Sequence, residues 1–104
     1  MQGILQIYHN GQWGTICDDN WDVTDTNVAC KQLGFANAST FQHLGQGSGP
    51  IWLDDVDCSG GELSLGQCQH PGWGTHNCGH SEDVGIVCNI GKDLSIGHCI
   101  THSL

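Results

Sequence analysis

The chain has almost no positive charge. Lys31 and Lys92 are the only Lys or Arg residues among 104, against eleven Asp and Glu, and the formal net charge is −9. Proteins that bind nucleic acid neutralise its phosphates with clustered Lys and Arg. Anionic membrane surfaces attract the same residue types. We therefore exclude nucleic acid as a partner, and attraction to an anionic membrane is unfavourable.

Long apolar segments are also missing. No run approaches the roughly 18 apolar residues that a membrane-spanning helix needs, so we expect no membrane insertion. Apolar residues make up 38% of the chain, and 16 residues are glycine. This composition leaves little apolar surface for a conventional core. The glycines add to the cost of folding, because glycine loses the most conformational freedom. The length fits one domain.

Cysteine, by contrast, is abundant, with seven residues. In a short chain with a small core, this content is typical of a secreted domain held by disulfides, which stabilise by about 2 to 4 kcal/mol each. We therefore predict an extracellular or cell-surface location. The first residues show no signal-peptide pattern, so we expect the chain to be part of a larger secreted or membrane protein. Asn37-Ala38-Ser39 is an acceptor for N-glycosylation at Asn37.

The residue pattern predicts an α+β domain. Asn10-Gly11 lies between two strand-like segments, residues 4–8 and 12–17, and is a strong hairpin signal. A helix of about ten residues is expected after a cap at Thr24 or Asp25, with Gly34 ending it. Residues 37–50 are small, polar and rich in glycine, which favours a long loop. Further strands are expected at residues 51–53 and 84–88, with one helical turn within residues 62–67.

Four segments carry a family resemblance. They are GQWGTICDD at 11–19, VACKQLG at 28–34, GSGPIWLDDV at 47–56 with CSG at 58–60, and HNCGHSED at 76–83. In order and spacing they closely resemble a scavenger receptor cysteine-rich (SRCR) domain over about residues 3 to 88. The resemblance implies a curved antiparallel β-sheet cradling one α-helix. Phe35 stands where the eight-cysteine subgroup has a further cysteine, so the chain resembles the six-cysteine group, group A.

Spacing alone does not choose among the pairings that six cysteines allow. The family resemblance implies three disulfides, which are Cys17 with Cys78, Cys30 with Cys88, and Cys58 with Cys68. Residues 1–88 then form an SRCR-like domain that lacks the family's usual first strand, which is expected to leave a sheet edge exposed. Residues 89–104 form a tail outside the family pattern. It holds an unpaired Cys99, through which a disulfide-linked dimer could form.

Acidic residues gather around the predicted bridge of Cys17 with Cys78. Asp18 and Asp19 follow one strand, Asp54 and Asp55 follow another, and Glu82 comes shortly after Cys78. Like charges repel at close range, and calcium takes six to eight oxygen ligands, so a bound Ca²⁺ is expected, with Mg²⁺ as the alternative ion. The resemblance implies one cation site at Asp18, Asp19 and Glu82 and a second at Asp54, Asp55 and Asn77. A solvated acidic face without an ion is the alternative.

Two functions follow as hypotheses. In the first, calcium gives an extracellular module the positive charge that it lacks, and the metal's open positions bind anionic polysaccharides or glycoproteins. In the second, the domain is a metal-independent interaction or spacer module that contacts extracellular proteins through residues 42–46 and Trp73.

Catalysis is not expected. Ser81 and His80 are adjacent in sequence, which does not build a catalytic triad. The histidine and cysteine spacing does not match structural zinc sites, apart from a weak cluster of His98, Cys99 and His102. His9, His43, His70 and His76 are interpreted as polar surface residues.

Overall fold

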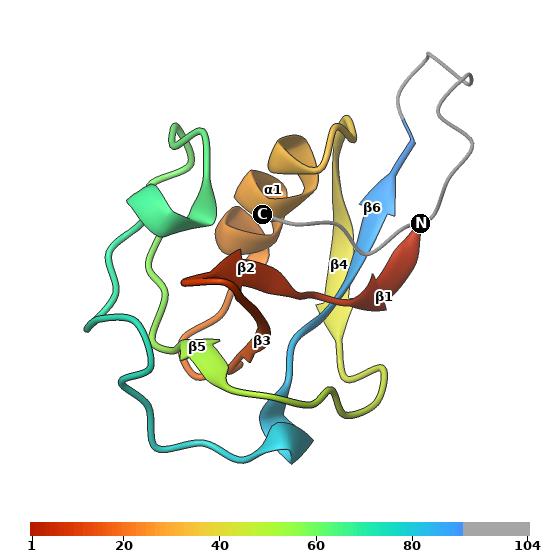
Figure 1. Cartoon of the computed structure of the whole chain (residues 1–104). Helices are drawn as coiled ribbons and strands as arrows, with labels where there is room; N and C mark the ends of the chain where they lie inside the picture. Colours follow the sequence, from red (N-terminus) through yellow and green to blue (C-terminus); the bar gives the residue numbers. More distant parts are fainter. Residues whose placement is uncertain (91–104) are drawn as a thin grey trace.

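The computed structural model describes residues 1–90. Its first sheet has the order β1-β6-β4 and is antiparallel throughout, with β1 at Gln2–Ile4, β6 at Gly85–Asn89 and β4 at Asn37–Gln42. Its second sheet has the order β2-β3-β5 (Figure 1). The tail was predicted to begin at residue 89, but Asn89 is the last residue of β6. The rest of the predicted tail from residue 91, which includes Cys99 and so the suggested dimer and zinc cluster, lies outside the described residues.

The second sheet begins with the predicted hairpin. β2 (Ile7–His9) and β3 (Gln12–Ile16) pair antiparallel, and the two turn residues Asn10 and Gly11 have φ of 52° and 79°. Positive φ at both positions is what a type I′ turn requires, so the Asn-Gly signal is confirmed. β5 (Ile51–Leu53) pairs with β3 in parallel, which places the ends of these two strands side by side.

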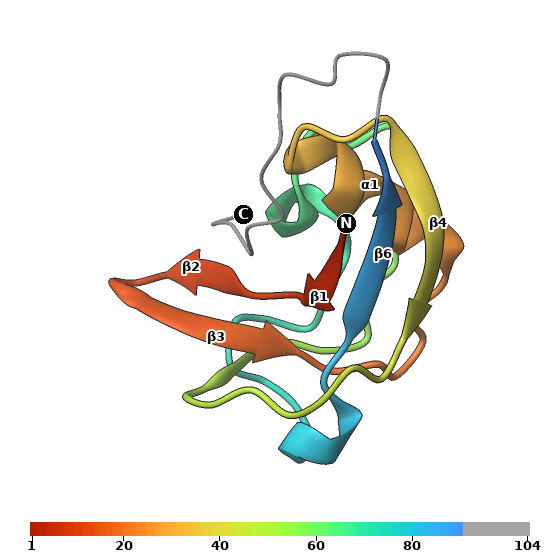
Figure 2. The ribbon, with the colours of Figure 1, turned by 90° about the vertical axis from the view of Figure 1, so that its right-hand side faces the viewer.

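The helix α1 spans Val23–Gln32 and contacts β4 and β6 (Figure 2). The predicted cap was wrong, because the N-cap is Asp22. Its carboxylate accepts from the backbone N–H of Asp25 at 3.0 Å, and the Asp25 carboxylate accepts from the N–H of Asp22 at 2.9 Å, which makes a capping box. Gly34 has φ of 93° immediately after the C-cap, as expected for a left-handed helix end.

The predicted long loop at residues 37–50 was wrong in its first part. Residues 37–42 form β4, which pairs with β6 across some fifty residues of sequence, and only the following residues are loop. All but one of the β4 residues are exposed, so the strand carries no alternating apolar pattern. The predicted strand at 84–88 is β6, and the predicted helical turn is a short 3₁₀ helix at Leu65–Gln67.

One core connects the helix with both sheets. It is built from buried apolar side chains and two of the disulfides, and its members include Leu5, Ile7, Ile16, Trp21, Val28, Ala29, Phe35, Leu53, Val56, Leu65, Val84 and Ile86. The fold is therefore α+β with small antiparallel sheets, as expected, although the β3–β5 pair is parallel. No helix among residues 1–90 is long and apolar enough to cross a membrane.

Candidate functional site

The bridge between Cys17 and Cys78 is the centre of the candidate site. Cys17 directly follows β3, forms an isolated β-bridge with Asp83, and is bonded to Cys78, with the two Cα atoms 6.3 Å apart. The structure also contains Cys30–Cys88 and Cys58–Cys68, so its pairs are those that the resemblance implies. The first bridge brings together chain segments 61 residues apart in sequence.

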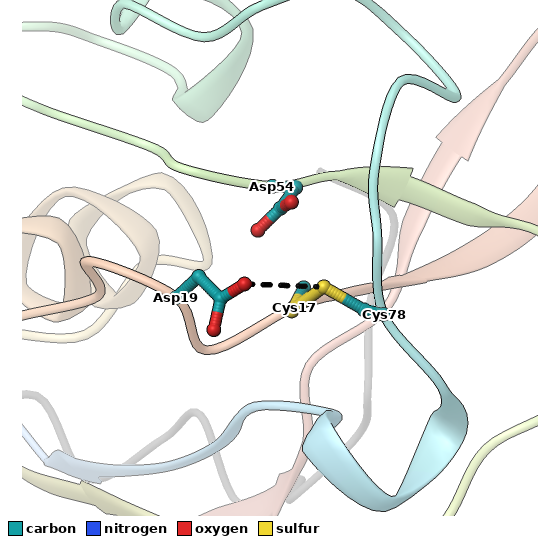
Figure 3. Close-up of side chains that lie close together, drawn as sticks. All are labelled: Cys17, Asp19, Asp54 and Cys78. Atoms are coloured by element: carbon teal, nitrogen blue, oxygen red, sulfur yellow. Dashed lines mark hydrogen bonds between the residues drawn. A yellow bond between two sulfur atoms is a disulfide. The ribbon is translucent and has the colours of Figure 1, made fainter.

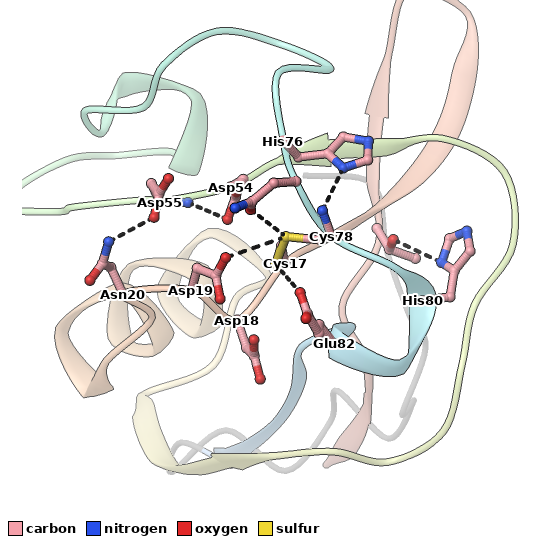
Figure 4. Close-up of a disulfide and its surroundings, with 12 residues drawn as sticks. Cys17, Asp18, Asp19, Asn20, Asp54, Asp55, His76, Cys78, His80 and Glu82 are labelled. Carbon is pink, nitrogen blue, oxygen red and sulfur yellow. Dashed lines mark hydrogen bonds between the residues drawn. A yellow bond between two sulfur atoms is a disulfide. The ribbon is translucent and has the colours of Figure 1, made fainter.

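Three carboxylates form the first group beside this bridge. Ligand oxygens of Asp18, Asp19 and Glu82 lie within 4.8 Å of one another, and all three residues are partly exposed (Figure 4). The Cys17 sulfur lies 3.2 Å from Oε2 of Glu82. A disulfide sulfur carries no hydrogen and is not a thiolate, so this is a contact only, and the available ligand atoms are the oxygens.

A second group lies on the other side of Asp19. Oxygens of Asp19 and Asp54 lie within 4.8 Å of each other, and Figure 3 shows both carboxylates beside the disulfide. The backbone N–H of Cys17 donates to the carbonyl of Leu53 at 2.9 Å, which fixes Asp54 next to the bridge. Asp54 is only 1% exposed, and burial, with smaller contributions from the charges of Asp55 and Asp19, raises its pKa.

The Asn77 side chain faces both carboxylates of the second group. With its nitrogen turned toward them, the amide donates to Oδ2 of Asp19 at 3.1 Å and to Oδ2 of Asp54 at 3.3 Å. With its oxygen turned toward them, three oxygens face one another, an arrangement that a cation would stabilise. The amide can therefore serve the group either as a hydrogen-bond donor or as an oxygen ligand.

Asp55 does not join this group, in contrast to the set of Asp54, Asp55 and Asn77 that the resemblance implies. Asp55 is exposed, has φ of 50°, and its Oδ1 accepts from Nδ2 of Asn20 at 2.7 Å. Asp19 takes its place beside Asp54 and Asn77. The physical reason is the left-handed backbone at Asp55, which lies beyond the end of β5 and directs this side chain to Asn20.

A hydrogen-bonded pair of His80 and Asp83 flanks Glu82 of the first group in the sequence. Asp83 is fully buried, and its Oδ2 accepts from Nδ1 of His80 at 2.8 Å and from the backbone N–H of Gly47 at 2.7 Å. Nε2 of His80 donates to the carbonyl of Gly49 at 2.9 Å. Both ring nitrogens thus face acceptors, and the hydrogen bond to Asp83 raises the pKa of His80. The pair ties the loop after β4 to the segment that carries Glu82.

His43 is the contact that sequence reasoning missed. Its Nε2 is bonded to Oδ2 of Asp18, although the ring itself is largely exposed. The contact exists because β4 pairs with β6 and delivers the residue after the strand to the acidic group. The sequence around His43 gives no indication of this contact, and sequence analysis therefore interprets His43 as a polar surface residue.

The donor set fits a hard cation. The available ligand atoms are carboxylate oxygens and one amide oxygen, which is the set that Ca²⁺ and Mg²⁺ prefer over thiolate or imidazole. Three protein residues in a partly exposed group would leave coordination positions open to water or a ligand.

Asn37, the predicted glycosylation acceptor, is exposed at the start of β4, and its Oδ1 accepts from Nδ2 of Asn89 at 2.6 Å.

Comparisons with known proteins agree on one family. A family model described as the scavenger receptor cysteine-rich domain matches residues 1–89. Human lysyl oxidase homolog 4 is 55% identical over 91 residues, covering 85% of this chain and 12% of that protein. A scavenger receptor cysteine-rich domain superfamily protein of Patiria pectinifera is 50% identical over 91 residues, covering 85% of this chain and 8% of that protein. The chain thus spans a small part of these relatives.

Two solved structures have the same fold. The SRCR domain of mouse MARCO, described in a dimeric form, is 47% identical with a TM-score of 0.81, over 86% of this chain and 87% of that one. The third SRCR domain of murine neurotrypsin is 42% identical with a TM-score of 0.75, over 88% of each chain.

Proposed function

This chain belongs to the scavenger receptor cysteine-rich domain family, and from that premise we propose that it is a calcium-dependent module for binding anionic extracellular ligands. SRCR domains occur in extracellular and cell-surface proteins and mediate interactions there. In the proposal, Asp18, Asp19 and Glu82 hold the ion, and its open positions accept a carboxylate, sulfate or phosphate of a polysaccharide or glycoprotein. The module has no catalytic role.

The single observation that carries the proposal is the convergence of three carboxylates within 4.8 Å in a chain that is nearly without bases. Lys31 is the only Lys or Arg among the described residues, and it lies in the last turn of α1. An anionic ligand therefore meets repulsion unless a cation is present. A bound Ca²⁺ would both relieve the repulsion among the carboxylates and supply the attraction.

The second group extends the proposal. Asp19 borders both groups, so an ion held by Asp54, Asn77 and Asp19 would share a ligand residue with the first. The raised pKa of Asp54 reflects the cost of burying its charge, and a cation would offset that cost. We assign Ca²⁺ as the principal ion because the groups are irregular and partly exposed, whereas Mg²⁺ demands near-octahedral geometry.

A metal-independent interaction module is the second candidate function. One observation favours it, which is a pair of exposed aromatic residues on the hairpin. Tyr8 and Trp13 are 48% and 40% exposed and pack edge to face with ring centres 5.3 Å apart. Trp73, the contact suggested from sequence, is less suited, because it is half-buried and stacks on His9 at 3.7 Å.

Ligand capture tests the two candidates against each other. An immobilised sulfated polysaccharide should retain the oxidised protein in calcium, release it in EDTA, and fail to retain the Asp18→Ala, Asp19→Ala double variant. The control is Asp57→Ala, which removes an exposed carboxylate outside both groups. Retention in EDTA, with loss of an extracellular protein partner in a Trp13→Ala variant, would instead favour the metal-independent module.

A further inference from the structure

A cavity of about 310 Å³ opens beside the first acidic group. It is lined by Asp18, Phe41, Gln42, His43 and Val84. Phe41 and Gln42 end β4, His43 follows that strand, and Val84 directly precedes β6. The antiparallel pairing brings these segments together, with Phe41 opposite Ile86 and Gln42 opposite Gly85. The cavity is therefore part of the fold.

Its walls differ in chemistry. Phe41 is 37% exposed, a high value for a large apolar side chain, and with Val84 it gives the cavity an apolar surface. Gln42 and His43 add an amide and an imidazole next to it. Asp18 also lines the cavity, and Nε2 of His43 contacts its Oδ2. An anion bound to a metal at Asp18 would thus sit beside a cavity whose lining is partly apolar and partly polar.

An acidic sugar unit matches this arrangement. A pyranose ring presents a face of C–H groups that packs on aromatic rings, and an edge of hydroxyls that needs donors and acceptors. The cavity is at the small end of the roughly 300 to 1,000 Å³ range of ligand sites, so it suits one ring. An acidic peptide side chain has an aliphatic stem and no hydroxyls, so it would offer no hydroxyl to the exposed Gln42 amide.

We propose that this cavity is a subsite for one pyranose unit of an acidic polysaccharide, with the sulfate or carboxylate on the metal at Asp18 and the ring against Phe41. The inference rests on the proposed calcium function and names its ligand class. Phe41, Gln42 and His43 would then determine specificity for the sugar. The ion, held by Asp18, Asp19 and Glu82, would supply the positive charge that attracts the ligand.

Substitutions at Phe41 test the subsite, with dextran sulfate as the saccharide probe and polyglutamate as the peptide probe. Phe41→Leu removes the ring and keeps an apolar side chain, whereas Phe41→Tyr keeps the ring. In calcium, we expect dextran sulfate to bind Phe41→Leu about tenfold more weakly and Phe41→Tyr as tightly as the unmodified protein. His43→Ala, a second variant outside the strand, should also weaken binding. Calcium affinity, titrated without saccharide, should stay within about twofold for both Phe41 variants.

The outcomes separate the two levels of the proposal. If the unmodified protein binds no calcium, the proposed function fails and the subsite with it. If calcium binds and dextran sulfate affinity is the same in Phe41→Leu and His43→Ala, the subsite is overturned and the metal site stands. If polyglutamate binds as tightly as dextran sulfate with the same dependence on Phe41, the saccharide assignment is overturned in favour of an acidic peptide.

Discussion

The backbone N–H of Asp18 donates a hydrogen bond to the backbone carbonyl of Glu82 at 3.0 Å. The two residues are far apart in sequence, yet the β-bridge of Cys17 with Asp83 and the Cys17–Cys78 disulfide hold their backbones together. Their carboxylates therefore start from neighbouring points of a fixed scaffold. The main chain and the bridge thus preorganise the first group, so ordering these side chains costs little conformational entropy when an ion binds.

Removing the Cys17–Cys78 bridge should weaken calcium binding as well as the fold. A Cys17→Ser, Cys78→Ser variant is expected to lose about 4 kcal/mol of unfolding free energy, because the bridge closes a separation of 61 residues. It should also bind calcium at least about tenfold more weakly, since Asp19 and Glu82 both contact its sulfurs. Urea unfolding and calcium titration of the same samples measure both effects.

The matched control is the bridge of Cys30 with Cys88, which closes a nearly equal separation of 58 residues away from the acidic groups. Its removal should cost a similar free energy of unfolding, about 4 kcal/mol. In the fraction that is folded, calcium affinity should be unchanged. Equal losses of calcium affinity in the two variants would show that the first bridge has no special part in the site.

The second prediction concerns Asp54, whose burial beside Asp19 is unfavourable without an ion. Asp54→Asn keeps an oxygen to accept from the N–H of Asp55, which Oδ1 of Asp54 does at 2.8 Å, and removes the charge. In EDTA the variant should be more stable than the unmodified protein, because it removes a buried charge. Saturating calcium should stabilise the variant less than it stabilises the unmodified protein, because fewer ligands hold the ion in the variant. A variant that is less stable in EDTA and gains as much from calcium would refute this.

A pH dependence of stability follows from Asp25. Its carboxylate is fully buried, and burial raises its pKa from 3.8 to about 6 even though it accepts from the N–H groups of Cys58 and Asp22. The folded pKa exceeds the unfolded one, so this group stabilises the fold below about pH 4, and that stabilisation is lost as pH rises through 6. The free energy of unfolding should fall by up to about 3 kcal/mol over this window.

Comparison with Asp25→Asn isolates this contribution from other titrating groups. The variant is less stable at every pH, since its amide nitrogen cannot accept from Asp22, but the downward slope between pH 4 and 6 should be reduced by the contribution of Asp25. Urea unfolding at half-unit pH intervals provides the curves. Parallel curves for the two proteins would contradict the raised pKa.

Local signals predicted the parts of the fold that local chemistry determines. Asn10-Gly11 specified the hairpin because few residues accept positive φ twice in succession, and Gly34 marked the helix end for the same reason. The helix start was misplaced, because Thr24 and Asp25 are good cap residues too, and only the reciprocal bonds of Asp22 with Asp25 distinguish them. β4 was missed because its stability comes from pairing with β6 rather than from its own exposed sequence.

The candidate site divides in the same way. The family resemblance implied that Asp18, Asp19 and Glu82 form one group, and in the structure their ligand oxygens lie within 4.8 Å of one another. It also implied Asp55, which instead bonds to Asn20, because the direction of a side chain at a strand end depends on the local φ. His43 reaches Asp18 only through the β4–β6 pairing, so no spacing in the sequence could indicate the contact.

Calorimetric titration of calcium into the oxidised protein tests the central claim most directly. The unmodified domain should bind calcium with a dissociation constant of roughly 0.1 to 1 mM, the range of extracellular calcium modules. The Asp18→Ala, Asp19→Ala variant should remain folded and show no binding. The absence of binding to the unmodified protein up to about 10 mM calcium, or equal binding by the folded double variant, would contradict the account.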